Sequence, residues 1–192
     1  MPRYILHGGA TRIENDANKQ FFAQMASDIP AGGTWLGIYF ARPDLDGENT
    51  TFERDIPHFK IRVPERTDIK FILATEANWH QEILKADCVY LAGGNTQKLQ
   101  QTLMTVPNAR ELFMLDKTYS GSSAGMYVLG RDSLDSVDET GELVRLESLN
   151  ILPYGMVAHY GAPEYHATQA NLGSRKRPLL MLAETQFVVI EQ

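Results

Sequence analysis

The 192-residue chain contains a single cysteine, Cys88, so no disulfide can form within it. Cys88 lies in the apolar run 88–92, which favours a buried structural thiol over a reactive one. Basic residues are also in the minority, with 18 Lys and Arg against 24 Asp and Glu, so the net charge is −6. That balance argues against nucleic acid and anionic lipid as partners, because both repel an acidic chain.

Long apolar runs and a leader segment are missing as well. No apolar stretch approaches the length of about 20 residues that a membrane-spanning helix needs. The first nine residues contain the strand-like segment 3–7 and lack the charged and apolar regions of a signal peptide. We therefore expect a cytoplasmic protein with no membrane partner.

Nucleotide and metal motifs are also absent. Neither G-x-G-x-x-G nor the P-loop pattern occurs, so the sequence does not support a nucleotide cofactor. The acidic segment 41–56 carries Asp44, Asp46 and Glu48, but its glycine and its distal glutamate are misplaced for a calcium loop. We expect a solvated loop that runs into a short helix there, and a site without metal or cofactor.

The chain does contain a regular alternation of short β-prone runs and helical patterns. The predicted strands are 3–7, 35–40, 59–63, 70–73, 88–92, 118–120, 156–160 and 187–190. The predicted helices are 15–27, 76–86, 96–105, 109–115, 124–130 and 175–183. Such alternation predicts right-handed βαβ units, and hence an α/β fold with a mostly parallel sheet and helices on both faces. Because there are no repeats and no linker-like segment, residues 1–192 are expected to form one domain.

One segment carries an explicit chemical pattern. Residues 121–125 read G-S-S-A-G, which matches the G-x-S-x-G nucleophile elbow, a tight strand-to-helix turn that exposes one serine. Gly121 and Gly125 fit this turn because a side chain at either position would crowd the turn and the substrate. Ser123 is therefore the candidate nucleophile. The N–H of Ala124, at the start of the following helix, is a candidate donor to a developing oxyanion.

A serine nucleophile needs a base, and the base needs an orienting group. Of the five histidines, His159 ends the apolar run 155–158, so it lies where a predicted strand meets a loop. Active sites of open α/β sheets gather at such carboxyl ends of strands, and Ser123 lies at one too. His7, which ends the first strand, is the competing base. The orienting carboxylate is sought between Ser123 and His159, where the charge pattern does not choose among Asp132, Asp135, Asp138 and Glu139.

A second oxyanion donor is offered by the segment 90–96, a strand that runs into Gly93 and Gly94 and then a helix cap. Glycines here let the backbone approach a ligand and leave amides exposed. A Gly-Gly turn also serves simply to change the direction of the chain, and the pair Gly8 and Gly9 shows the same ambiguity.

Taken in order, the segments 93–96, 122–125 and 159–160 resemble the peptidase E (α-aspartyl dipeptidase) and cyanophycinase family of serine peptidases. The turn 7–11 is similar to that family's first βα loop, and the similarity extends to about residue 177. The resemblance implies a fold like that of class I glutamine amidotransferases, with serine in place of cysteine at the elbow. It also implies hydrolysis of a peptide bond next to an acidic residue in small peptides, through a Ser–His–acid triad.

Carried over by position, the resemblance makes Ser123 the nucleophile and His159 the base. The backbone amides of Gly94 and Ala124 match the oxyanion hole. Asp138 falls closest to the position of the family's aspartate, and the alternatives for this third triad member are Asp135 and Glu139.

The resemblance also implies contacts to the substrate. It places Asn95 and Thr96 at the substrate, and Arg175 matches best the cation that contacts an acidic side chain. A bidentate guanidinium suits such a carboxylate, although a basic run at 174–177 also fits a solvated helix start.

Two other functions are compatible with the same residues. An esterase of the α/β-hydrolase type shares the elbow and the order Ser…acid…His, but its chain is normally longer and its histidine comes later. A non-catalytic amidotransferase-like domain that binds a small ligand or a partner is the second alternative. The favoured hypothesis is a peptidase that hydrolyses small peptides and acts as a monomer or a homodimer.

Overall fold

The computed structural model describes residues 1–42, 48–135, 144–163 and 178–192. Within these ranges the main sheet has six strands in the order β10–β1–β5–β4–β2–β3. They are β1 (Arg3–His7), β2 (Thr34–Ile38), β3 (Lys70–Leu73), β4 (Cys88–Leu91), β5 (Thr118–Ser122) and β10 (Phe187–Glu191). All neighbouring pairs are parallel except β10, which runs antiparallel to β1 at the edge. The predicted mostly parallel α/β sheet is therefore confirmed.

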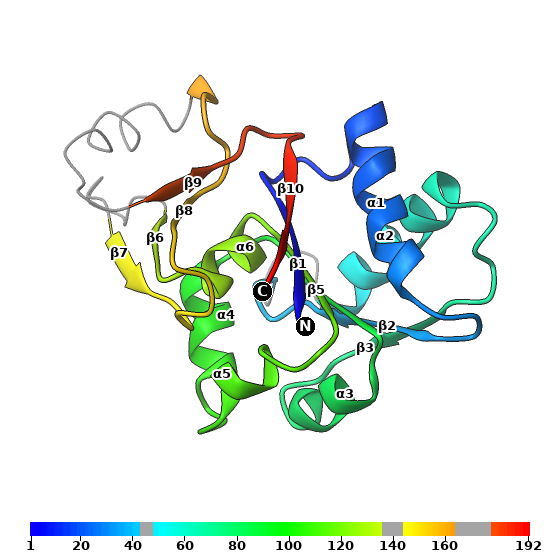
Figure 1. Ribbon diagram of the computed structural model, residues 1–192, viewed down its shortest axis with the longest axis horizontal. Helices are drawn as coiled ribbons and strands as arrows, with labels where there is room; N and C mark the ends of the chain where they lie inside the picture. Colours follow the sequence, from blue (N-terminus) through cyan, green and yellow to red (C-terminus); the bar gives the residue numbers. More distant parts are fainter. Residues whose placement is uncertain (43–47, 136–143, 164–177) are drawn as a thin grey trace.

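Helices cover both faces of this sheet (Figure 1). One face carries α1 (Asp16–Asp28) and α2 (Glu48–Arg62), and the other carries α3 (Trp79–Lys85), α4 (Thr96–Leu103), α5 (Ala109–Leu112) and α6 (Ala124–Leu129). The strands serve both layers because successive side chains point to opposite faces. In β1, Ile5 packs under α1 and α2, whereas Tyr4 and Leu6 pack on the opposite side.

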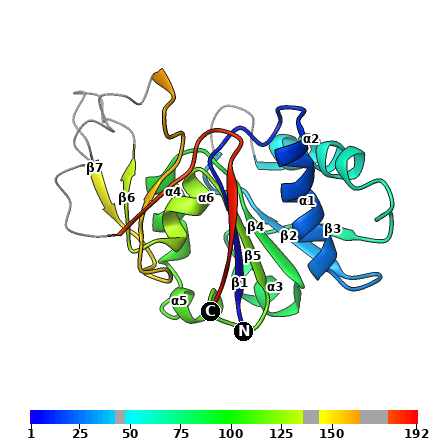
Figure 2. The same cartoon turned by 45° about the horizontal axis from the view of Figure 1, so that its top comes forward.

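A second sheet of four strands stands beside the α4–α6 layer (Figure 2). Its order is β7–β6–β8–β9, formed by β7 (Val144–Glu147), β6 (Asp132–Asp135), β8 (Gly155–Val157) and β9 (Leu179–Met181). Helix α6 contacts β4 and β5 of the main sheet and also β6 and β8 of the second one. All of its residues are buried, as a helix between two sheets requires.

Two predicted elements are wrong. In the segment 59–63, expected as a strand, residues 59–62 form the end of α2, which continues through Pro57, and Val63 follows it. The buried side chains of Phe59 and Val63 lie four residues apart, which is the spacing of one helical face. Residues 179–181, expected within a helix at 175–183, form β9. A short apolar run such as this one fits either state, and here pairing with β8 decides it.

Cys88 is fully buried in β4, and desolvation raises the pKa of its thiol well above the usual value, as suits a structural cysteine. Within the described ranges, no helix is both long enough and apolar enough to cross a bilayer.

Candidate active site

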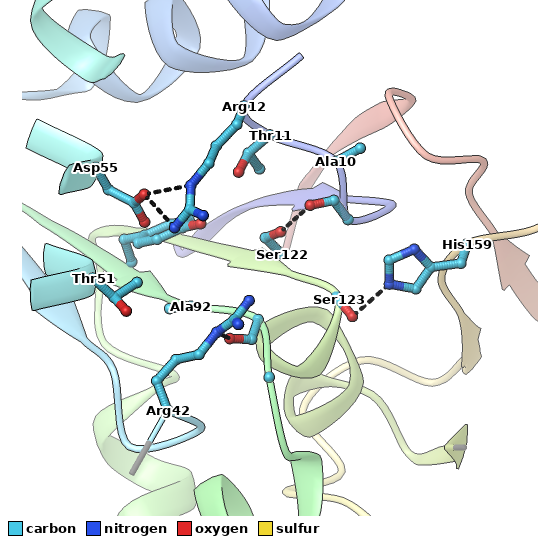
Figure 3. Close-up of a pocket in the computed structure, with 14 residues that line it drawn as sticks. Ala10, Thr11, Arg12, Arg42, Thr51, Asp55, Ala92, Ser122, Ser123 and His159 are labelled. Atoms are coloured by element: carbon cyan, nitrogen blue, oxygen red, sulfur yellow. Dashed lines mark hydrogen bonds and ion pairs between the residues drawn. The ribbon is translucent and has the colours of Figure 1, made fainter. Parts of the chain in front are cut away.

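A cavity of about 380 Å³ opens at the carboxyl ends of the main-sheet strands (Figure 3). Its wall is built from the loops after β1, β2 and β4, from the end of β5 and from one side of α2. At this edge β1 leads into α1 on one face of the sheet, while its neighbour β5 leads into α6 on the other. The chain thus diverges from the sheet here, which is where open α/β sheets bind ligands.

Ser123 occupies the predicted sharp turn between β5 and α6. Its backbone has φ 50° and ψ −109°, an unfavourable conformation for a residue with a side chain. Both flanking glycines are required by close packing. A Cβ on Gly121 would stand 2.5 Å from the carbonyl carbon of Gly125, and a Cβ on Gly125 would overlap the carbonyl of Leu91. The strand, turn and helix that define a nucleophile elbow are therefore present.

Three side chains form a row at the mouth of this turn. The Ser123 Oγ lies 2.8 Å from His159 Nε2, and His159 Nδ1 lies 2.7 Å from Glu184 Oε1. The imidazole is largely shielded, with 17% of its side chain exposed, and the Glu184 side chain is 36% exposed. An Nδ1–H that donates to Glu184 leaves Nε2 free to accept the serine proton. This order of groups is that of a nucleophile, a base and an orienting carboxylate.

The loop after β1 contacts both His159 and the segment that carries Glu184. The His159 N–H donates to the carbonyl of Gly8 at 2.9 Å, and His159 itself adopts a φ of 54°. Gly9, at φ 141°, lies directly against the imidazole ring, where a Cβ would overlap it. The N–H of Ala10 donates to the backbone carbonyl of Glu184 at 2.8 Å. One short loop therefore fixes the imidazole and the segment that carries the carboxylate.

His7, the competing base, is used for a different purpose. It is fully buried, its Nε2 lies 2.7 Å from Asn18 Oδ1, and its Nδ1 accepts the N–H of Gly9 at 3.0 Å. The pKa of His7 is lowered to about 4, chiefly by burial; the bond to Asn18 opposes this shift, and the nearby His159 adds to it. The His7 carbonyl also accepts the N–H of Ser123 at 3.1 Å. The structure thus places His159, and not His7, at the serine hydroxyl.

The two amides expected to bind an oxyanion belong to Gly94, which follows β4, and to Ala124, which follows Ser123 in the chain. Gly94 has a φ of 145°, and a Cβ on it would overlap the carbonyl of Ala41, so only glycine fits this position. Gly93 packs beside Ser123, since its Cβ would lie 3.2 Å from that of the serine. Ala124 begins α6. Among the described residues none accepts the N–H of Gly94 or Ala124, so both amides are available to a ligand.

Asn95 and Thr96, expected at the substrate, are positioned by α4. The Asn95 side chain accepts the N–H of Lys98 at 2.8 Å and so caps the helix. The Thr96 side chain is 1% exposed. In the described part of the chain neither residue is on the cavity wall.

The other predicted site residues are the candidate carboxylates and Arg175. Asp138, Glu139 and Arg175 lie outside the described residues. Asp132 is buried at the start of β6 beside β8, and Asp135 ends the same strand.

Glu184 is the group that sequence reasoning missed. The carboxylate was sought only between the serine and the histidine, whereas Glu184 follows both. A strand at 179–181 would have been the useful signal, because β9 runs parallel to β8 and ends beside it. The carboxyl ends of parallel strands meet at one edge, so a carboxylate just after β9 falls near His159, which follows β8.

The described ranges contain no group of three or more His, Cys, Asp or Glu side chains placed to hold an ion. The polar groups that gather at the cavity are those of hydroxyl, imidazole, carboxylate and guanidinium chemistry.

The fold and the elbow together define a class, the α/β proteins with a glutamine amidotransferase-like fold. The chain belongs to peptidase family S51, whose family model matches residues 58–192. It is therefore a peptidase, which confirms the resemblance drawn from the sequence and the expectation of a hydrolase. Among proteins with curated descriptions, none matches the chain.

Solved structures support the fold. A crystal structure from Listeria monocytogenes EGD-e, described as a candidate peptidase E, matches with a TM-score of 0.67 and 16% identity, covering 100% of this chain and 99% of the other. A peptidase from an acI-B1 Actinobacterium matches with a TM-score of 0.60 and 18% identity, over 88% of this chain and 71% of the other. At these identities the similarity concerns the architecture alone.

Proposed function

We propose that this peptidase uses Ser123 as its nucleophile, His159 as its base and Glu184 as the carboxylate that orients the base. The observation that carries the proposal is the continuous row from Ser123 Oγ through the imidazole to Glu184, with contacts of 2.8 Å and 2.7 Å. Ser123 lies at the elbow and lines the cavity, as a nucleophile must.

The chemistry follows from this arrangement. His159 Nε2 takes the hydroxyl proton while Ser123 Oγ attacks the scissile carbonyl carbon. The amides of Gly94 and Ala124 stabilise the oxyanion of the tetrahedral intermediate. His159 then gives the proton to the leaving amine as the peptide bond breaks, which leaves an acyl-enzyme. Water, deprotonated by the same imidazole, attacks the ester and releases the second product.

The size and charge of the cavity support our proposal of small peptides with an acidic residue as substrates. Its volume of about 380 Å³ is at the small end of the range for ligand sites. Two arginines, Arg12 and Arg42, line the same cavity as Ser123, and a guanidinium suits a carboxylate. We propose a dipeptidase that prefers an Asp residue, with Arg175 as a further candidate contact. The expectation of a cytoplasmic monomer or homodimer stays a prediction that fractionation and gel filtration would test.

The test is a substrate screen with the purified protein and its Ser123→Ala variant. Dipeptides of the type Asp-X, Glu-X and neutral-X are offered beside p-nitrophenyl esters. We expect cleavage of Asp-X peptides by the native protein and loss of nearly all turnover in the variant. Cleavage of esters without any peptide would favour an esterase, and no turnover of either would favour a non-catalytic ligand-binding domain.

A further inference from the structure

Thr51 of α2 has a buried hydroxyl that no described residue satisfies. The side chain is 1% exposed, its Oγ1 has no hydrogen-bond partner among the described residues, and the residue lines the active-site cavity. Leaving a buried hydroxyl unpaired is unfavourable, so such a group in a native cavity indicates a missing polar partner. A ligand in the cavity would supply that partner.

Arg42, which follows β2, presents a second unsatisfied group to the same space. Its Nε donates to the carbonyl of Gly93 at 2.6 Å, which fixes the plane of the guanidinium. Within the described ranges no residue accepts a hydrogen bond from its two Nη atoms. The guanidinium points into the region between Thr51 and Ser123 (Figure 3). Gly93, whose carbonyl holds Arg42, packs against Ser123, and Arg42 and Ser123 line the same cavity.

Arg12, the other arginine of the cavity, has its charge matched within the wall. Its Nη2 and Nε lie 2.9 Å and 3.0 Å from Asp55 Oδ1. The second oxygen of Asp55 accepts the hydroxyl of Tyr39 at 3.0 Å. Asp55 therefore neutralises Arg12, while Arg42 has no carboxylate partner among the described residues. The unmatched positive charge of the described lining is thus that of Arg42.

We propose that Arg42 and Thr51 form a carboxylate-binding subsite beside the serine, an assignment that rests on the proposed peptidase function. The free Nη edge of Arg42 donates two hydrogen bonds to the carboxylate, and the Thr51 hydroxyl donates a third. The same chemistry serves a side-chain carboxylate next to the scissile bond or the terminal carboxylate of a dipeptide.

The experiment measures binding without turnover, by calorimetry on the Ser123→Ala protein. Three probes are compared: Asp-Leu, Asn-Leu and Asp-Leu amide. The step from Asp-Leu to Asn-Leu removes the side-chain charge, and the step to the amide removes the terminal charge. We expect at least one step to weaken binding tenfold or more, and that step identifies which carboxylate the subsite holds.

Variants at the two residues assign the effect. When Arg42→Gln is added to the Ser123→Ala protein, the difference in affinity between the two probes of that step should fall to less than twofold. Arg42→Lys should retain part of the difference, because an ammonium lacks the bidentate geometry of a guanidinium. Thr51→Val should weaken the acidic probe about threefold to tenfold. Arg110→Gln, at an arginine of α5 that bonds only the Asn150 carbonyl in the described structure, is the matched control and should leave all three affinities unchanged. Thermal unfolding of each variant establishes that it is folded.

The outcomes separate the two proposals. Full discrimination in folded Arg42→Gln, or equal binding of all three probes, overturns the subsite even if peptides are hydrolysed. Discrimination that depends on Arg42, in a protein that hydrolyses no peptide, retains the subsite and overturns the peptidase mechanism.

Discussion

Gly9 lies against the imidazole of His159 so closely that a single methyl group on Gly9 would overlap the ring. The contact is made by backbone at φ 141°, a conformation that glycine adopts readily and other residues rarely do. The loop after β1 therefore restricts the position of the imidazole of the proposed catalytic base. It also limits the orientations in which the ring can face Ser123.

The Gly9→Ala variant should lose activity through displacement of His159. A shift of about 1 Å in a catalytic group reduces kcat by roughly 10²-fold, so a loss of that size or larger is expected. Gly32→Ala is the matched control, because Gly32 also has a positive φ, of 70°, but has open space where its Cβ would lie. Equal activity of the two folded variants would contradict this role for Gly9.

The orienting carboxylate can be identified by comparing two isosteric amides. Glu184→Gln leaves the shape of the row intact but removes the negative charge beside Nδ1 of His159 and adds an NH2 group that can donate to Nδ1, which favours the wrong tautomer, so kcat should fall roughly 10²- to 10⁴-fold. Asp138→Asn should stay within about threefold of the native rate. A large loss in Asp138→Asn with little change in Glu184→Gln would restore the assignment expected from the sequence. Glu191→Gln, at an exposed carboxylate of β10, controls for the loss of charge.

His7 predicts a specific dependence of stability on pH. Its pKa is about 4 in the folded protein and about 6.5 in the unfolded chain, so the unfolded state binds more protons between these values. The stabilisation from keeping His7 neutral is complete above pH 6.5 and is lost as the pH falls toward 4, by about 3 kcal/mol. Urea unfolding at pH 6.5 and 4.5 should register about 2 kcal/mol of this loss. In His7→Gln the free energy of unfolding should change less over the interval, and an equal change would exclude His7 as its source.

The Thr51→Val variant should be more stable than the native protein although it binds the acidic probe more weakly. Thr51→Val removes an unpaired buried hydroxyl while keeping the shape of the side chain, so the free energy of unfolding should rise by about 1 kcal/mol. Thr118→Val provides the contrast, because the Thr118 hydroxyl donates to Asp28 at 2.7 Å and its loss should destabilise by about 1–2 kcal/mol. Denaturant unfolding of both variants compares them. Equal destabilisation would mean that the Thr51 hydroxyl is satisfied in the free protein.

Most of the fold could be predicted because local patterns and tertiary packing agree. The run 3–7 is strand-like and lies in the sheet with the predicted bounds, as does 70–73. Disagreement arises where a pattern fits two states. The aromatic and β-branched run 59–63 resembles a strand, yet residues 59–62 end α2. Val63 follows directly, its N–H donates to the Phe59 carbonyl, and both side chains are buried.

The site divides in a similar way. Ser123 could be predicted because the nucleophile elbow is a pattern of five consecutive residues, in which packing requires a glycine at the first and last positions. Glu184 could not, because its place beside His159 depends on the pairing of β8 with β9 and on the hydrogen bond from Ala10 to its carbonyl. Both are long-range contacts that leave no local pattern. The role of His7 depends equally on burial against Asn18, which the sequence does not reveal.

The most direct test of the central claim is labelling with a fluorophosphonate probe, followed by mass spectrometry of the labelled peptide. The probe reacts with a serine whose hydroxyl is activated by a neighbouring base. We predict stoichiometric labelling at Ser123 in the native protein and strongly slowed labelling in folded His159→Gln. Absence of label on Ser123 in the native folded protein, or equal labelling in His159→Gln, would contradict the account.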